Sequence, residues 1–145
     1  MMTEPELQGG APLLSDATRQ RMEGTRRGLL RLHKALLDSE RAVYEKEKGR
    51  VSPGELLQLL IQDARFAWLR PFSEMVILID EMLEIAGDSD KSPAEQDGAA
   101  LLEQVRLLLR PAGEESRYYD ALQRDPAVVQ AHAEVSKLLP AIKEA

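Results

Sequence analysis

The chain has 145 residues, with 19 Lys and Arg against 25 Asp and Glu, a net charge of −6, no Cys and 4% aromatic residues. This is the length of one ordinary domain, which buries about 68% of its unfolded surface without covalent staples. The missing Cys excludes disulfides, thiolate zinc sites and a Cys nucleophile, and no apolar run approaches the roughly 20 residues of a membrane helix.

The first 15 residues differ in composition from the rest of the chain. Residues 1–15 mix Pro, Gly and acidic residues without any period, which predicts a disordered N-terminal lead before a single helical domain over residues 16–145. The lead opens with acidic residues and has no apolar core, so it does not resemble a signal peptide. We therefore expect a cytoplasmic protein.

A long first helix is predicted from Asp16 to Lys48, where only Gly24 and Gly28 disfavour a helix, each by about 1 kcal/mol relative to Ala. Most of its apolar residues follow Gly28. At about 1.5 Å per residue the helix is about 50 Å long, whereas a globule of this size has a diameter of roughly 40 Å. We therefore expect it to bend at a Gly, to start later, or to overhang the body at its apolar-poor start, which favours a dimer.

Later helices begin at recognisable signals. Ser52-Pro53-Gly54-Glu55 predicts a capping box with Pro at the first helical position, and Ser92-Pro93-Ala94-Glu95 repeats that signal. Between them, a helix opened by Pro71 is apolar on all sides over Met75–Ile79, which predicts a place in the middle of a bundle. Two shorter helices follow near the C-terminus. The predicted fold class is all-α, an antiparallel helical bundle of four main helices plus short C-terminal helices.

Charge is distributed unevenly along the chain. Residues 17–34 carry a net charge of +5, which leaves −11 for the rest, and residues 74–103 carry −8. The basic stretch indicates either an arm that binds nucleic acid or another anion, or a solvated face that pairs with the acidic segment. The acidic remainder opposes approach to phosphates, so nucleic acid is the weaker alternative. The candidate interaction residues on this stretch are Arg19, Arg26, Arg27 and Arg31.

A second candidate interaction segment holds the single Trp of the chain. Trp68 and Arg70 lie close together in it, and aromatic residues beside Arg are enriched at interfaces. A lone Trp in a small helical domain also fits a plug between two helices. We favour the packing role, with Arg65 or Arg70 in solvent or near Asp63.

Three polar residues, His33, Glu40 and Tyr44, lie close to the apolar seam of the first helix. A His and a Glu could supply metal ligands, or a general base and the acid that orients it, and the carboxylates of Asp80 and Glu84 could add to them. However, neither His of the chain follows a Glu by three residues, as the metal pattern of helical bundles requires. A hydrogen-bonded polar layer is the simpler interpretation, so we predict no metal, no cofactor and no catalytic residue.

Three stretches resemble a group of small bacterial all-helical proteins to which no activity is attached. They carry the patterns LHKxLLDxERxxYE from Leu32, GRVSPGELLQL from Gly49 and FAWLRP from Phe66. The resemblance covers about residues 30–85. It implies a helical fold and a bacterial source, and it implies no function.

Long capped helices without a catalytic motif predict a protein-interaction or small regulatory module that self-associates, as a homodimer, or binds another protein. Two alternatives stay open. The first is a ligand- or metal-binding bundle, with or without enzymatic activity, that uses His33, Glu40 and Tyr44. The second is binding of nucleic acid or another anion by the start of the first helix. No membrane association is expected.

Overall fold

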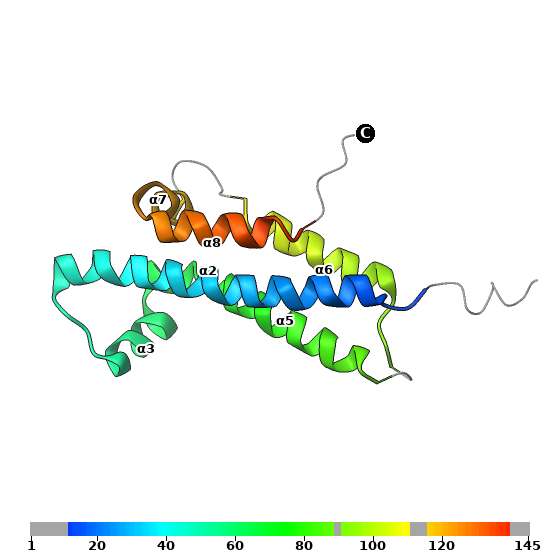
Figure 1. Ribbon diagram of the computed structural model, residues 1–145. Helices are drawn as coiled ribbons and strands as arrows, with labels where there is room; N and C mark the ends of the chain where they lie inside the picture. Colours follow the sequence, from blue (N-terminus) through cyan, green and yellow to red (C-terminus); the bar gives the residue numbers. More distant parts are fainter. Residues whose placement is uncertain (1–11, 89–90, 111–115, 140–145) are drawn as a thin grey trace, which may run out of the picture.

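The computed structural model describes residues 12–88, 91–110 and 116–139, and these residues confirm the all-helical prediction. Apart from one isolated bridge between Leu13 and Ala94, their regular structure is helical. The helices, shown in Figure 1, are α2 (Asp16–Lys48), α3 (Pro53–Gln62), α4 (Ala64–Ala67), α5 (Arg70–Ala86), α6 (Glu95–Leu108), α7 (Arg117–Arg124) and α8 (Pro126–Ser136).

Helix α2 is the central element of the fold. It runs without interruption through 33 residues and contacts α5, α6, α7 and α8, while α5 also contacts α6 and α7 contacts α8. Figure 1 shows the other helices distributed along its length. Its buried apolar side chains are Met22, Leu29, Leu32 and Leu36, and the core forms where the three leucines meet the other helices.

The two glycines of α2 lie where α8 approaches most closely. A Cβ on Gly28 would lie 2.9 Å from the Cβ of Val135, and one on Gly24 would lie 3.2 Å from a methyl carbon of Leu138. These residues were expected to weaken or bend the helix. The structure shows a packing reason for them, because glycine lets a second helix approach the backbone of the first.

The apolar-poor start of α2 does not overhang the body, contrary to one of the expectations from its length. Thr18, Met22 and Thr25 are buried there, and a Cβ on Gly98 of α6 would lie 3.1 Å from the Thr18 methyl group. The exposed end is the opposite one, residues 46–48. Length alone could not show which end the later helices cover.

Ser15 and Glu95 join the starts of α2 and α6. The Ser15 side chain accepts a hydrogen bond from the Thr18 amide, and Glu95 accepts bonds from the Ser15 amide (2.7 Å) and the Thr18 hydroxyl. These bonds hold the pKa of Glu95 below its ordinary value. Leu14, within the predicted N-terminal lead, is buried. Residues 1–11 of that lead lie outside the described residues.

The two similar start signals have different outcomes. Ser52 and Glu55 form the predicted capping box of α3. At the second signal, however, the helix begins at Glu95 rather than next to Ser92: the Glu95 carboxylate is bonded to the start of α2, and Asp97 accepts from the Ala94 amide instead. A local pattern predicts a cap only where no distant backbone competes for the same carboxylate.

The prediction that Met75–Ile79 lies in the middle of the bundle is wrong for two of its residues. Ile77 is 54% exposed and Leu78 is 44% exposed, while Val76 and Ile79 are buried. Helix α5 packs mainly against α2 and α6, and these two helices leave the side that carries Ile77 and Leu78 uncovered. One apolar side of α5 therefore faces outward.

Candidate functional site

Glu40 is a buried charge at the centre of an arginine cluster. Its side chain is 2% exposed, and its carboxylate lies 3.1 Å from Arg117 Nη1, 3.5 Å from Arg124 Nη2 and 3.7 Å from Arg65 Nε. These arginines come from α7 and α4, so one carboxylate of α2 connects three helices. A buried charge is tolerated when such partners replace its water. We call Glu40, Arg65, Arg117 and Arg124 the arginine cluster.

Further bonds fix the arginine cluster in place. Arg124 Nε donates to the Ser39 hydroxyl at 2.9 Å, and Arg65 Nη2 donates to Glu47 at 3.0 Å. Arg65 also lies over the Tyr44 ring, 5.7 Å from its centroid. Both carboxylate oxygens of Glu40 thus face guanidinium groups, which suits a structural tie better than proton transfer to a ligand.

The structure brings Glu40 and Tyr44 of the predicted polar seam together and places His33 apart from them, in a small hollow. Tyr44 meets Glu40 through their shared neighbour Arg65, and its ring lies 5.8 Å from that of Phe66. His33 lines a hollow of about 120 Å³ that Phe66 also lines, and neither Glu40 nor Tyr44 is among the residues lining it. Burial lowers the pKa of His33.

Asp80, one of the two acids that could have added to this seam, is used elsewhere, because it pairs with Arg26. Within residues 12–88, 91–110 and 116–139, no three His, Asp or Glu side chains gather as metal ligands would.

An aromatic cluster surrounds Trp68. Its ring stacks on Tyr118 at 6.3 Å between centroids and meets the edge of Phe72 at 6.2 Å. The Tyr118 hydroxyl lies within hydrogen-bond distance of His132 Nδ1. Burial raises the pKa of Tyr118 and lowers that of His132. No local sequence pattern connects this Tyr–His pair, because its members lie on two different short helices.

Three of the candidate arginines bind other elements of the fold. Arg19 donates to the Ala86 carbonyl at 3.1 Å, Arg26 pairs with Asp80, and Arg70 donates to the Ile61 carbonyl at 3.0 Å. Arg19 and Arg70 thereby satisfy carbonyls at the C-terminal ends of α5 and α3, where a cation is favoured. Part of the basic stretch thus pairs with α5 inside the same chain.

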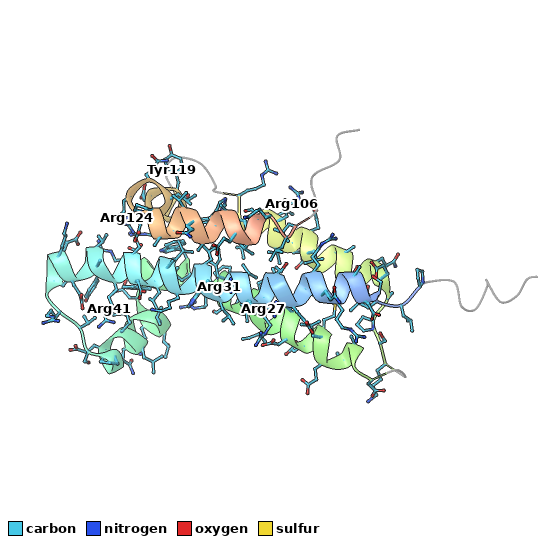
Figure 2. All side chains as sticks on the ribbon, in the orientation of Figure 1. Arg27, Arg31, Arg41, Arg106, Tyr119 and Arg124 are labelled. Atoms are coloured by element: carbon cyan, nitrogen blue, oxygen red, sulfur yellow. The ribbon has the colours of Figure 1, made fainter. Side chains whose placement is uncertain are left out.

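Three of the four remaining cations of this stretch, all except Arg21, form a basic stripe on the exposed side of α2. Arg27, Arg31 and Lys34 are exposed, and Leu30 among them is 45% exposed. Lys34 pairs with Asp38 at 3.0 Å. Arg27 and Arg31, shown in Figure 2, make no hydrogen bond or ion pair with the described part of the chain. We call Arg27, Leu30, Arg31 and Lys34 the basic stripe.

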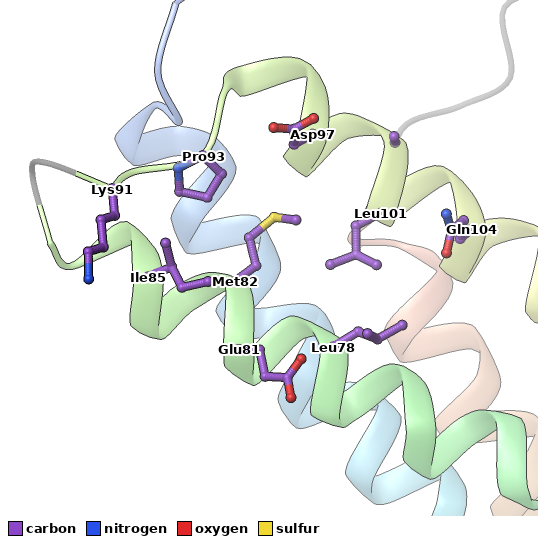
Figure 3. A pocket seen from close by; sticks show the side chains of 10 residues that line it. Leu78, Glu81, Met82, Ile85, Lys91, Pro93, Asp97, Leu101 and Gln104 are labelled. Carbon is purple, nitrogen blue, oxygen red and sulfur yellow. The ribbon is translucent and has the colours of Figure 1, made fainter.

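A hollow of about 500 Å³ lies between α5 and α6. Figure 3 shows its side chains, with α2 behind α5. Its apolar residues include Leu78 and Ile85, which are 44% and 46% exposed. We call this hollow the α5–α6 groove; its lining residues are Leu78, Glu81, Met82, Ile85, Lys91, Pro93, Asp97, Ala100, Leu101 and Gln104.

Acidic side chains border the α5–α6 groove. Glu81 and Asp97 line it from its two helices, and an adjoining hollow of about 350 Å³ adds Glu84 and Asp88. Lys91 is the one base that lines either hollow. The groove therefore combines an apolar floor with a negatively charged border. The acidic segment can be recognised in the sequence. Whether exposed leucine and isoleucine side chains lie beside these acids depends on which side of α5 the other helices cover, and the sequence does not show this.

Comparison with known proteins identifies no relative of the chain: no family model, curated protein or solved structure matches it. The resemblance to small bacterial helical proteins thus stays a prediction. None of the helices in the described ranges is both long enough and apolar enough to span a bilayer.

Proposed function

We propose that the protein is an interaction module that binds a basic amphipathic helix in the α5–α6 groove. The observation that carries the proposal is the exposure of Leu78 and Ile85 in a hollow bordered by Glu81 and Asp97. The proposal keeps two predictions from the sequence: a cytoplasmic location and an antiparallel arrangement of the main helices.

The chemistry of the α5–α6 groove matches that of an amphipathic helix. Such a helix places apolar residues at i, i+3, i+4 and i+7 along one side, where they can cover Leu78, Met82 and Ile85. Lys and Arg residues beside that apolar side would then meet Glu81 and Asp97. The apolar contact supplies affinity, and the charges select a basic partner over an acidic one.

The two alternatives from the sequence have less support. A ligand site that uses His33, Glu40 and Tyr44 would need Glu40 to leave its arginine partners, whose contacts already occupy the carboxylate. Nucleic-acid binding by the start of α2 would have fewer cations to use, because Arg19 and Arg26 are bonded to α5.

The test is titration of the ¹⁵N-labelled protein with a synthetic Leu/Lys amphipathic helical peptide. We expect chemical-shift changes that concentrate on α5 and α6 around Leu78 and Ile85. Binding should weaken at least about tenfold in Ile85→Glu, because the substitution places an acid on the apolar floor.

The matched control is Leu107→Glu, since Leu107 is 51% exposed on α6 and does not line the groove. Equal loss of binding in both variants, or equal binding of a Leu/Glu peptide, would contradict the proposal. Thermal unfolding of each variant establishes that it is folded.

A further inference from the structure

We propose that the occupant of the α5–α6 groove is the basic stripe of α2 from a second copy of this chain. This inference rests on the proposed function, because it assigns a partner to the same groove. It also specifies the self-association that the length and charge of the first helix predict. Both surfaces lie on described residues, and their charges are opposite.

The basic stripe has the pattern that the groove requires. Arg27, Arg31 and Lys34 are spaced at i, i+4 and i+7, so they share one side of α2, and Leu30 lies among them. Leu30 is 45% exposed, which is unusual on a helix whose other leucines are mostly buried. Arg27 and Arg31 are available for an external acid, because they are not bonded to other described residues.

The charge of the groove complements that of the stripe. Glu81, Glu84, Asp88 and Asp97 line the α5–α6 groove and the hollow beside it, against the single base Lys91. The stripe contributes three cations, of which Lys34 is paired with Asp38 of the same helix and Arg27 and Arg31 are unpaired among the described residues. Leu30 of one copy would cover Leu78 or Ile85 of the next, while Arg27 and Arg31 would meet the acids of the border.

The positions of the two surfaces determine the type of assembly. In the view into the groove, α2 passes behind α5 (Figure 3), and the basic stripe lies on the exposed side of α2. Each copy therefore offers its groove and its stripe on different faces. Such contacts are head-to-tail, so a third copy can add to a pair unless the assembly closes into a ring.

The experiment uses two charge-reversed variants of the full chain. One is Arg27→Glu/Arg31→Glu in the stripe, and the other is Glu81→Lys/Glu84→Lys in the groove border. Light scattering on the wild type should show a mass that rises with concentration and falls with added salt. Each variant alone should associate at least about tenfold more weakly, because its groove and stripe have the same charge.

An equimolar mixture of the two variants should recover association, since every groove then finds a stripe of opposite charge. The control is Lys46→Glu/Lys48→Glu, which makes the same charge change at exposed positions of α2 outside the stripe. This control should associate as the wild type does. Equal weakening in the control, or no recovery in the mixture, would overturn the inference.

The outcome also separates this inference from the proposed function. A strictly monomeric wild type that still binds the Leu/Lys peptide in the groove would overturn the second-copy partner and leave the helix-binding function standing. A protein that neither binds the peptide nor associates would overturn both.

Discussion

The two halves of α2 lie in opposite chemical environments. Around its C-terminal half, Glu40 is almost fully buried and is contacted by three arginines from α4 and α7. Beside its N-terminal half, α5 and α6 leave Leu78 and Ile85 about half exposed under an acidic border. We call these regions the closed half and the open half.

The comparison shows where this fold has room for a partner. In the closed half a charge lies inside the protein, and other residues of the same chain satisfy it. In the open half apolar surface lies outside, and no described residue covers it. Buried charges that are paired are structural as a rule, whereas exposed apolar patches with a polar border mark interaction sites.

The largest effect is expected where the closed half is broken. Glu40→Ala removes the carboxylate that Arg65, Arg117 and Arg124 share. We expect the free energy of unfolding to fall by about 3 kcal/mol. This value is at the lower end of the range for removing one partner of a buried ion pair, because two of the arginines are partly exposed. Urea denaturation followed by circular dichroism measures this change.

The matched control for this substitution is Glu47→Ala, which removes an exposed partner of the same Arg65. It should cost less than about 1 kcal/mol. An equal cost for both substitutions would mean that burial of the charge does not distinguish the closed half.

Part of this comparison was open to prediction from the sequence, and part was not. The capping box of Ser52 and Glu55 was predicted because its members are three residues apart and depend on nothing distant. Glu40 was noticed as a polar residue on an apolar seam. Its partners Arg117 and Arg124 lie 77 and 84 positions further along the chain, and no local pattern connects them.

The groove could not be predicted from the sequence either, but the reason differs from that for the partners of Glu40. An all-round apolar stretch such as Met75–Ile79 predicts burial on every side, and that expectation holds only if enough helices surround it. Helix α3 has no fully buried residue and is bonded to the start of α5, where Arg70 donates to the Ile61 carbonyl, so it leaves Ile77 and Leu78 exposed. The number of neighbours around a helix is a property of the whole fold.

A second, smaller effect is expected at the contact that joins the halves, the crossing of α2 and α8. A Cβ at Gly28 would lie 2.9 Å from Val135 Cβ and 3.3 Å from its Cα. We expect Gly28→Ala to lower the free energy of unfolding by about 1–2 kcal/mol, because overpacking exceeds the gain in helix propensity. The measurement is again urea denaturation.

The control is Gly54→Ala in the first turn of α3, where an added Cβ would meet nothing within 4 Å. This substitution should leave stability unchanged or raise it by up to about 1 kcal/mol. A stabilising Gly28→Ala would show that α8 moves away from α2 at little cost.

The smallest effect is expected from mild acid. Burial lowers the pKa of His33 and of His132 from the ordinary value of 6.5. Below pH 6.5 the unfolded chain therefore binds protons that the folded protein does not yet bind. The free energy of unfolding should thus be highest above about pH 6.5 and decrease as the pH falls toward the folded pKa values. The lowered pKa of Glu95 and Glu45 contributes only in more acid solution, because their ordinary value is 4.5.

His33→Gln separates this effect from a general response of the protein to acid. It removes one of the two titrating groups. In urea denaturation from about pH 7.5 to about pH 5.5, the free energy of unfolding of this variant should therefore depend less steeply on pH than that of the wild type. His132→Gln should do the same through the second group, although it also changes the contact with Tyr118. If the free energy of unfolding depends on pH as steeply in both variants as in the wild type, neither histidine is desolvated enough to link protonation to folding. The closed half would then owe its stability to Glu40 and its arginines without the half-buried imidazoles.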